Sequence, residues 1–553
     1  MTFHILRQIT TFVVNLKISY HRKHCQTFLL KILIPKTLNK KLLTINWIYF
    51  GYILKVDADM DLIRLKNYRC LEDTGEVEIK PLTFLVGSNS SGKSSFLKFF
   101  PLLKQSMRVK KRGAFLWTGS NVDLKDFKNT LRSGTDQMEI SFTLKQMKLK
   151  RRMRVTSNTI LDDARLTIRI SRSQEHYDQI DYLCIKFPDQ IIECFFEENS
   201  KIRIKIGSLD SVDFKEKIRI LNTSSLLPHL IFYNTNRLGD ESYVCMERIE
   251  KLLEEFLNDA SNKISSLFIH SLVAVTKEKF KERICSRWKK DIDGEILNQL
   301  YDLSYYFNIN NIIDSINISL LQLAENITYI GPLREATERY YRFQNYAVDE
   351  IDPDGSNLAM YLYNLEDQEK KNLNEWITRV FDFQINVVSD GGHVELLVKE
   401  GAKQEQNLVD IGFGYTQILP ILVNIWKTLY MDSVFDDEFP SSLENDHILA
   451  IEQPELHLHP RFQVKFAILL ANVTVEAKKD KKNIRFIIET HSEMVLNKIG
   501  ELIALNKLDK KDVNVLLFNA KQEEMRNYVE FASYSKDGYL LNWPIGFFSE
   551  NVD

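Results

Sequence analysis

The sequence has few cysteines, and they do not form a metal or redox motif. The six cysteines are scattered, and no two of them are separated by only two residues. This pattern gives no support for a zinc site or a disulfide framework and favours reduced thiols in a cytoplasmic protein. The cysteines are Cys25, Cys70, Cys184, Cys194, Cys245 and Cys285.

The chain also lacks a large net charge of either sign. Its 73 Lys and Arg residues and 75 Asp and Glu residues give a formal net charge of −2. Any contact with nucleic acid therefore has to come from a local patch. Two basic clusters could follow a nucleic-acid backbone or be solvated faces of a helix or hairpin. The first contains Lys104, Arg108, Lys110, Lys111 and Arg112, and the second contains Lys145, Lys148, Lys150, Arg151, Arg152 and Arg154.

The apolar run at residues 42–54 is too short for a membrane-spanning helix. It lies between Lys41 and Lys55 and falls short of the roughly 20 residues that a span needs. It also lies too far from the N-terminus, behind too many charges, for an ordinary signal peptide. We therefore expect no stable membrane insertion.

Residues 1–59 differ in composition from the rest of the chain, with nine Lys and Arg residues against two acids. One interpretation is that translation begins at Met60, where a clean strand pattern starts, and that residues 1–59 are an artefactual or dispensable extension. The other is an anchor to a membrane surface or a partner. The sequence leaves both open.

The remaining chain predicts a two-part α/β unit with an insertion. Alternating apolar residues predict two short strands near residues 62–65 and 77–79, which suggest an antiparallel flap. Residues 135–220 have a largely β pattern, and residues 244–325 have helical spacing without a sustained heptad. The two parts of the α/β unit are predicted at residues 60–134 and 326–553, and the insertion is predicted at residues 135–325.

A phosphate-binding loop follows the buried apolar run at residues 82–86. The pattern Gly87-x-x-x-x-Gly92-Lys93-Ser94 stands between this strand and a predicted helix, as the motif requires. Its N–H groups hold phosphate oxygens, Lys93 reaches the β- and γ-phosphates, and Ser94 ligates Mg²⁺. The sequence therefore predicts a nucleoside triphosphate site. Its residues are Gly87, Ser88, Asn89, Ser90, Ser91, Gly92, Lys93, Ser94 and Ser95.

A second apolar strand, residues 447–452, ends in carboxylates. Glu452 is the candidate for the metal shell, and Gln453 and Glu455 follow it. We expect this strand end beside the phosphate loop, where it would position Mg²⁺ and water. His457 and His459 come next, but with no nearby Cys or third His a metal site there is disfavoured.

Two further segments predict contacts to phosphate. His491 follows the apolar strand at 484–489 and could bond a γ-phosphate and water, or be a satisfied core histidine. Gly412 and Gly414 precede a helical apolar run, which makes a second anion-binding helix start. One nucleotide needs only one phosphate loop. We therefore expect a head-to-tail dimer in which the 412–417 turn caps the γ-phosphate on the partner's Lys93.

These motifs resemble those of the ABC-type AAA ATPases, the group with SMC-like, RecF-like and OLD-family proteins. The resemblance implies an α/β P-loop NTPase head, with a mixed sheet flanked by helices and an antiparallel β flap. It also implies that Gly412, Gly414 and Gln417 act across an ATP-bound dimer and that His491 is the switch histidine. Residues 330–335 and the tail at 537–548 resemble a bacterial branch that ends in Trp-Pro-x-Gly-Phe-Phe.

One position departs from the family pattern. Many ABC ATPases have Asp-Glu at this strand end, whereas this chain has Glu452-Gln453. Glutamine cannot accept a proton as a general base, although it can orient water. Either Glu455 or Glu489 substitutes, or ATP is held for long periods. We favour slow hydrolysis and a long-lived ATP-bound dimer.

Relatives often act in genome maintenance or antiviral defence, several beside a separately encoded nuclease, as in Septu-type and retron-linked systems. About 60 residues follow Glu493, too few for a further catalytic domain. We therefore expect a separate effector nuclease, with this chain as the sensor or scaffold of a defence system. The alternatives are a DNA-repair or chromosome-maintenance ATPase that binds DNA directly, and a scaffold that binds nucleotide without hydrolysis.

Overall fold

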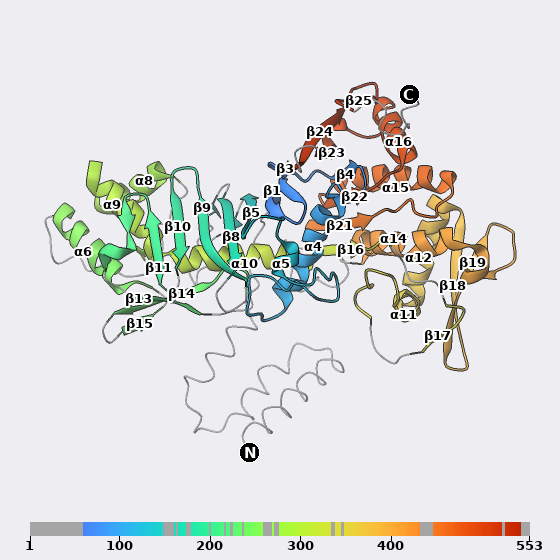
Figure 1. Ribbon diagram of the computed structural model, residues 1–553, viewed down its shortest axis with the longest axis horizontal. Coiled ribbons are helices and arrows are strands. Elements are labelled where there is room, and N and C mark those ends of the chain that lie inside the picture. Colours follow the sequence, from blue (N-terminus) through green and yellow to red (C-terminus); the bar gives the residue numbers. More distant parts are fainter. Residues whose placement is uncertain are drawn as a thin grey trace, which may run out of the picture. The chain divides into compact units, whose positions relative to one another are not determined.

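The computed structural model describes most of the chain from residue 59 to residue 543 (Figure 1). The predictions for residues 1–58 and for the tail from residue 544 lie outside the described residues. Inside this range, the residues not described are 146, 149–159, 162–163, 173–177, 198–200, 215–216, 222–224, 235–236, 240, 258–267, 270–275, 293, 333–337, 344–347, 432–445 and 522–525.

Five parallel strands form the centre of the fold. They lie in the order β23 (Val513–Lys521), β4 (Leu82–Gly87), β22 (Asn483–Glu489), β21 (Asp446–Glu452) and β16 (Ile327–Ile330). Every residue of β4 is buried, as are the last six of β21 and β22. Strands covered on both faces read as unbroken apolar runs, which is why the sequence identifies them.

One strand separates the two strands that end at the predicted site. β22 lies between β4, which precedes the phosphate loop, and β21, which ends in Glu452. Leu85 pairs with Glu489, and Glu489 pairs with Glu452. The carboxyl ends of β4, β22 and β21 therefore meet at one edge of the sheet, where open α/β sheets bind ligands.

Mostly antiparallel strands extend the same sheet beyond β23. β24 (Arg526–Tyr534) pairs with β23, then come β2 (Leu71–Asp73), β1 (Asp59–Tyr68) and β5 (Gln137–Lys145). The pair of β24 and β2 is parallel. The further strands, in sheet order, are β8 (Ala164–Arg172), β9 (Asp178–Lys186), β10 (Ile191–Phe196), β11 (Ile202–Ile206) and β12 (Leu209–Asp210), with β3 (Val77–Glu78) beside β1 and β25 (Leu540–Leu541) beside β24.

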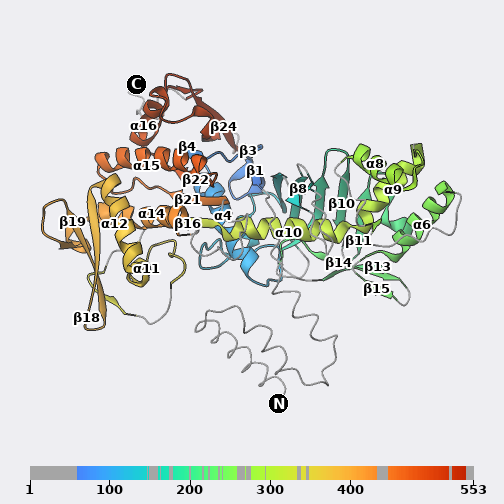
Figure 2. The ribbon, with the colours of Figure 1, turned by 180° about the vertical axis from the view of Figure 1, so that it is seen from behind.

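Helices complete the two regions of this unit. The helix after the phosphate loop is α4 (Lys93–Arg108), and α10 (Ile309–Glu325) contacts it. Figures 1 and 2 show α10 along one face of strands β8 to β11 before the chain enters β16. The remaining longer helices are α6 (Tyr243–Leu257), α8 (Lys277–Trp288), α9 (Gly294–Phe307), α12 (Asp367–Phe381), α14 (Phe413–Tyr430), α15 (Pro460–Lys479) and α16 (Glu493–Ala504).

Smaller elements surround this framework. One sheet contains β17 (Tyr341–Arg342), β19 (His393–Glu400), β18 (Phe383–Asp390) and β20 (Gln406–Asn407), and another contains β13 (Lys217–Leu221), β14 (His229–Asn234) and β15 (Arg237–Gly239). The short elements are β6 (Met147–Lys148), β7 (Ile160–Leu161), α5 (Phe127–Thr130), α11 (Leu358–Asn364), α13 (Leu408–Ile411) and two 3-10 turns, Ser211–Phe214 and Lys510–Asp512.

The fold class predicted from the sequence is confirmed. A mixed sheet is flanked by helices, and the β and then helical pattern of residues 135–325 is present. The described residues from 59 to 543 belong to one unit, in which the strands of the predicted insertion continue the sheet that contains β4. The boundaries proposed at residues 59, 134 and 325 stay predictions.

Candidate functional site

The phosphate loop connects β4 to α4 through a tight turn. Gly92 precedes the first residue of α4 with a φ of 113°, a conformation that side chains with a Cβ rarely adopt. A Cβ at Gly92 would lie 2.4 Å from Leu71 Cδ2. A Cβ at Gly87 would lie 2.2 Å from the carbonyl oxygen of Phe518. Both glycines are therefore required by close packing as well as by the motif.

Lys93 is held inside its own loop. Its ammonium donates hydrogen bonds to the carbonyl oxygens of Gly87 at 3.0 Å and Ser88 at 2.8 Å. Lys93 is only 3% exposed. Burial lowers its pKa, while the charges of Glu489 and Glu455 act in the opposite direction. The ammonium of Lys93, which is predicted to contact the phosphates, therefore lies within the loop and near the carboxylates of Glu489 and Glu455.

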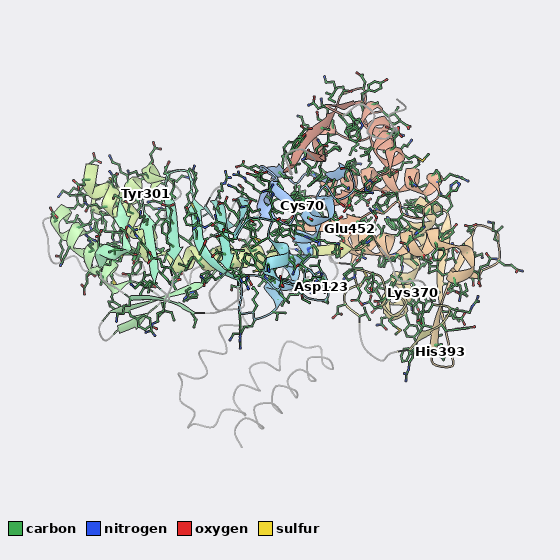
Figure 3. All side chains as sticks on the ribbon, viewed as in Figure 1. Cys70, Asp123, Tyr301, Lys370, His393 and Glu452 are labelled. Atoms are coloured by element: carbon green, nitrogen blue, oxygen red, sulfur yellow. The ribbon has the colours of Figure 1, made fainter. Side chains whose placement is uncertain are left out.

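The serines of the loop have different surroundings. Ser94 Oγ donates a hydrogen bond to Glu489 Oε1 over 2.9 Å. Ser91 Oγ is buried without a hydrogen-bond partner. Ser95 Oγ lies 3.7 Å from the thiol of Cys70, which is on the turn before β2 and is labelled in Figure 3. Of these three hydroxyl groups, that of Ser94 therefore contacts the carboxyl end of a strand, β22.

Glu452 ends β21 and is paired within the protein. Its carboxylate accepts a hydrogen bond from Tyr329 Oη at 2.8 Å, and Lys98 Nζ of α4 lies 3.6 Å away (Figure 3 labels Glu452). Burial raises the pKa of Glu452, and the nearby charge of Glu489 adds to that rise. Glu452 makes no bond to Ser94, whose hydroxyl donates to Glu489 instead. The metal role expected for Ser94 and Glu452 stays a prediction.

Glu455 holds the segment that contains His491, the predicted switch histidine. Glu455 Oε1 accepts from the backbone N–H of His491 at 2.7 Å, and Oε2 accepts from Thr490 Oγ1 at 2.9 Å. Burial raises the pKa of Glu455. Burial lowers the pKa of His491, and the charge of Lys93 lowers it further. A lowered pKa favours the neutral imidazole, which can both donate and accept a hydrogen bond.

Gln453 and Glu489 are joined through the backbone. The N–H of Gln453 donates to the carbonyl oxygen of Glu489 at 2.9 Å, and Gln453 has a left-handed φ of 41°. Glu489 is 2% exposed, and its Oε2 is buried without a partner. The sequence named Glu489 only as a substitute base. The sequence feature that could have identified Glu489 is an acidic residue at the end of an otherwise apolar strand.

These groups fit a divalent cation. Mg²⁺ prefers oxygen ligands and usually binds through one or two carboxylates together with substrate phosphates and water. Ser94 Oγ, the orphaned Glu489 Oε2 and the nearby Glu452 provide that chemistry. Within the described ranges, no group of three or more His, Cys, Asp or Glu residues has a metal-binding arrangement, so phosphate would have to complete such a site.

The second glycine turn lies at the start of α14. Gly412 has a φ of 114°, and a Cβ placed there would meet open space. Phe413 is 66% exposed, and its ring centroid lies 6.1 Å from that of His457. A Cβ at Gly414 would lie 3.5 Å from the carbonyl oxygen of His457. The turn therefore lies beside the segment that follows β21, with an aromatic side chain facing solvent.

Gln417 does not share this exposure. It is 5% exposed, because its position one turn into α14 faces the interior of its own chain. Contact with a nucleotide on another subunit would require this side chain to leave that environment. The role of Gly412, Gly414 and Gln417 across a dimer stays a prediction, and Gln417 supports it least.

The histidines after β21 have structural partners. His459 is the N-cap of α15, and its Nδ1 accepts from the N–H of Arg461 at 3.3 Å. His457 contacts Phe413. The expectation that these two histidines do not hold a metal stays a prediction.

The first basic cluster is largely used inside the protein. Lys104 is 6% exposed and donates to the carbonyl oxygen of Ile327 at 2.6 Å. Arg108 bonds both Glu325 and Glu350, and Lys111 donates to the carbonyl oxygen of Ser106 at 2.8 Å. Neither of the two alternatives for this cluster, a nucleic-acid contact or a solvated face, fits Lys104, because its ammonium is buried. Residues 149–154 of the second cluster lie outside the described residues.

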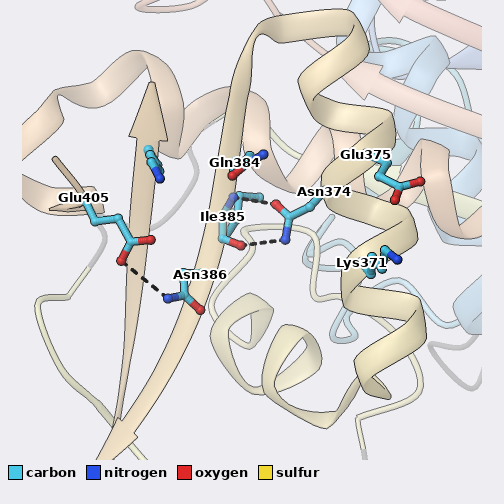
Figure 4. Close-up of a pocket in the computed structure, with 8 residues that line it drawn as sticks. Lys371, Asn374, Glu375, Gln384, Ile385, Asn386 and Glu405 are labelled. Carbon is cyan, nitrogen blue, oxygen red and sulfur yellow. Dashed lines mark hydrogen bonds between the residues drawn. The ribbon is translucent and has the colours of Figure 1, made fainter. Parts of the chain in front are cut away.

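A polar hollow lies elsewhere, between α12 and the β18 to β20 sheet (Figure 4). Asn374 of α12 bonds both the N–H and the carbonyl oxygen of Ile385, and so satisfies the backbone of edge strand β18. Asn386 donates to Glu405. The hollow contains no residue of the phosphate loop and is separate from the candidate nucleotide site.

The chain was compared with known proteins. A family model described as an AAA ATPase domain matches residues 60–496, which is more than half of the chain. No curated protein matches it. In the described part of the chain, no helix combines the length and hydropathy needed to cross a bilayer.

Two solved structures are similar at low identity. The Smc head domain of Pyrococcus furiosus, bound to the C-terminal domain of ScpA, has 10% identity and a TM-score of 0.33, covering 86% of this chain and 96% of that one. The SMC head domain of Thermotoga maritima has 8% identity and a TM-score of 0.31, covering 85% and 98%. TM-scores this low decide neither fold nor function.

Proposed function

The chain belongs to the AAA ATPase domain family, and from that premise we propose that it binds Mg²⁺ and ATP at Gly87–Ser94 and hydrolyses ATP slowly. The observation that carries this proposal is the arrangement at the carboxyl edge of the sheet. Lys93, Ser94 and His491 meet buried carboxylates there. Mg²⁺, when bound, would neutralise charge on the β- and γ-phosphates.

Slow hydrolysis follows from the residue after Glu452. Gln453 occupies the position of the usual catalytic glutamate and cannot accept a proton. Glu455 cannot easily replace it, because both of its oxygens accept hydrogen bonds from Thr490 and His491. Loss of a general base typically costs roughly 10²–10⁴-fold in rate. The ATP-bound state is therefore long-lived and suited to a switch.

We further propose that ATP closes two heads into a head-to-tail dimer through the Gly412 turn. The support is the exposed Phe413 beside a glycine with open space around it. The molar mass of the protein, measured by light scattering with and without Mg²⁺ and ATP, tests whether ATP causes dimerisation. We expect ATP to double the mass and Phe413→Asp to prevent it.

The matched control for this experiment is Val212→Asp, which places the same charge on an apolar residue that is 64% exposed in the inserted region. This variant should dimerise like the wild type. A wild type that stays monomeric with ATP would contradict the dimer.

The proposed biological role is sensor or scaffold in an antiviral defence system with a separate nuclease. Its support is the resemblance of the sequence motifs to such ATPases. Plaque formation on cells that carry the gene and its neighbours tests it. Protection that is lost with Lys93→Ala is expected, and unchanged plaque numbers with the wild-type genes would overturn the role.

A further inference from the structure

We infer that Glu489, at the end of β22, is the carboxylate that completes the Mg²⁺ site with Ser94. The inference rests on the proposed ATPase function and names a ligand group that the sequence motif assigns to a different strand. The sequence motif predicts that Glu452, the acid that ends β21, contributes to the Mg²⁺ site. Glu489 instead ends β22, the strand that pairs directly with β4.

The first support is the bond between the two residues. Ser94 Oγ, the hydroxyl expected on Mg²⁺, donates to Glu489 Oε1 at 2.9 Å. The partners are 395 residues apart in sequence, and the register that pairs Glu489 with Leu85 brings them together. A hydroxyl whose proton is held by a carboxylate directs its lone pairs elsewhere, as a metal ligand must.

The second support is the free oxygen of Glu489. Oε2 is buried without a hydrogen-bond partner, although Glu489 is only 2% exposed. A buried carboxylate oxygen with no partner is costly, and such groups commonly mark sites that bind an ion or water. The orphaned oxygen therefore points to a ligand next to Ser94.

The other two carboxylates are already engaged. Glu452 accepts from Tyr329 Oη and lies 3.6 Å from Lys98 Nζ. Glu455 uses both oxygens on Thr490 and His491. Of these three acids, Glu489 alone combines a bond to Ser94 with an oxygen left without a protein partner.

Mn²⁺ affinity in the presence of ADP, measured by electron paramagnetic resonance, tests the assignment without hydrolysis. Glu489→Gln keeps the side-chain shape and should weaken Mn²⁺ binding about 10–100-fold, as loss of a supporting carboxylate does. ADP affinity in EDTA should stay at the wild-type value. The control Glu501→Gln removes an exposed acid paired with Lys498 and should change neither quantity.

A double-mutant cycle with Ser94→Ala separates a shared site from independent effects. If the two residues serve one ion, the double variant should lose little more than the larger single loss. Glu489→Asp, which keeps the charge, should recover part of the affinity. This variant also tests the inference if Glu489→Gln has a lowered melting temperature.

Two results would overturn the inference, and they differ from failure of the proposed function. One is a Glu489→Gln protein with wild-type Mn²⁺ affinity, while Glu452→Gln loses tenfold or more. The other is full additivity of Ser94→Ala and Glu489→Gln. A wild type that binds no ADP or ATP at all would instead refute the proposed function and the inference with it.

Discussion

Glu455 accepts a hydrogen bond over 2.7 Å from the backbone N–H of His491. The bond ties the segment after β21 to the segment after β22, so the position of the histidine depends on a residue that follows the neighbouring strand. The same carboxylate also holds Thr490. Glu455 therefore fixes the position of His491, the predicted switch histidine.

Replacing Glu455 with Gln should slow phosphate release while leaving ATP binding close to wild type. The amide cannot accept both hydrogen bonds with the strength of a charged carboxylate, so His491 loses its fixed position. Displacement of a catalytic group by about 1 Å can cost up to about 100-fold in rate. Single-turnover phosphate release and equilibrium ATP binding measure the two effects.

Glu501→Gln is the control for this prediction, because Glu501 pairs with Lys498 on the surface of α16. A Glu455→Gln protein with an unchanged rate and an unchanged pH profile would show that the bond to His491 has no part in hydrolysis.

Gly92→Ala should destabilise the fold and weaken nucleotide binding. The alanine would have to adopt the φ of 113° that Gly92 has, and its Cβ would lie 2.4 Å from Leu71 Cδ2. Strain of this kind costs about 1–3 kcal/mol, and overpacking adds a similar amount. The free energy of unfolding from urea titration measures the sum.

Gly134→Ala provides the matched comparison, because Gly134 has a φ of 81° but open space around its Cβ position. It should show only the conformational cost. Equal losses in the two variants would mean that contact with Leu71 does not constrain the loop.

The ion cluster at the end of α4 predicts a pH dependence of stability. Burial alone would raise the pKa of Glu350, but the hydrogen bonds from Arg108 and the charge of Lys104 outweigh it and lower the pKa to about 2. A lowered folded-state pKa adds stability above the ordinary value of 4.5, and this stability is lost as the pH falls towards 2.

The melting temperature should therefore fall more steeply between about pH 5 and pH 2 in the wild type than in Glu350→Gln. Glu501→Gln should follow the wild type across this range. Parallel curves for the wild type and Glu350→Gln would contradict the contribution of this carboxylate.

The sequence could predict the parts of this fold that depend on local pattern. The phosphate loop, the strands that end at Glu452 and Glu489, and the helix after Gly412 all appear where apolar spacing indicated them. The adjacency of β22 and β4 could not be predicted in this way. The order of parallel strands is set by crossover connections, which local spacing does not encode.

Long-range partners explain the other differences. Lys104 appeared to be part of a surface patch, but its ammonium bonds the carbonyl oxygen of Ile327, 223 residues away. Gln417 fits the family motif by position, yet its helix turns it inward. Glu489 bonds Ser94 only because the sheet brings together residues that are 395 apart in the sequence.

Phosphate release in a single turnover by purified protein, compared with Lys93→Ala and Gln453→Glu, tests the central claim most directly. We predict Mg²⁺-dependent release far below the roughly 1–1,000 s⁻¹ of common enzymes, none with Lys93→Ala, and faster release with Gln453→Glu because a base is restored. Fast release by the wild type, or release that survives Lys93→Ala, would contradict a slow ATPase at this loop.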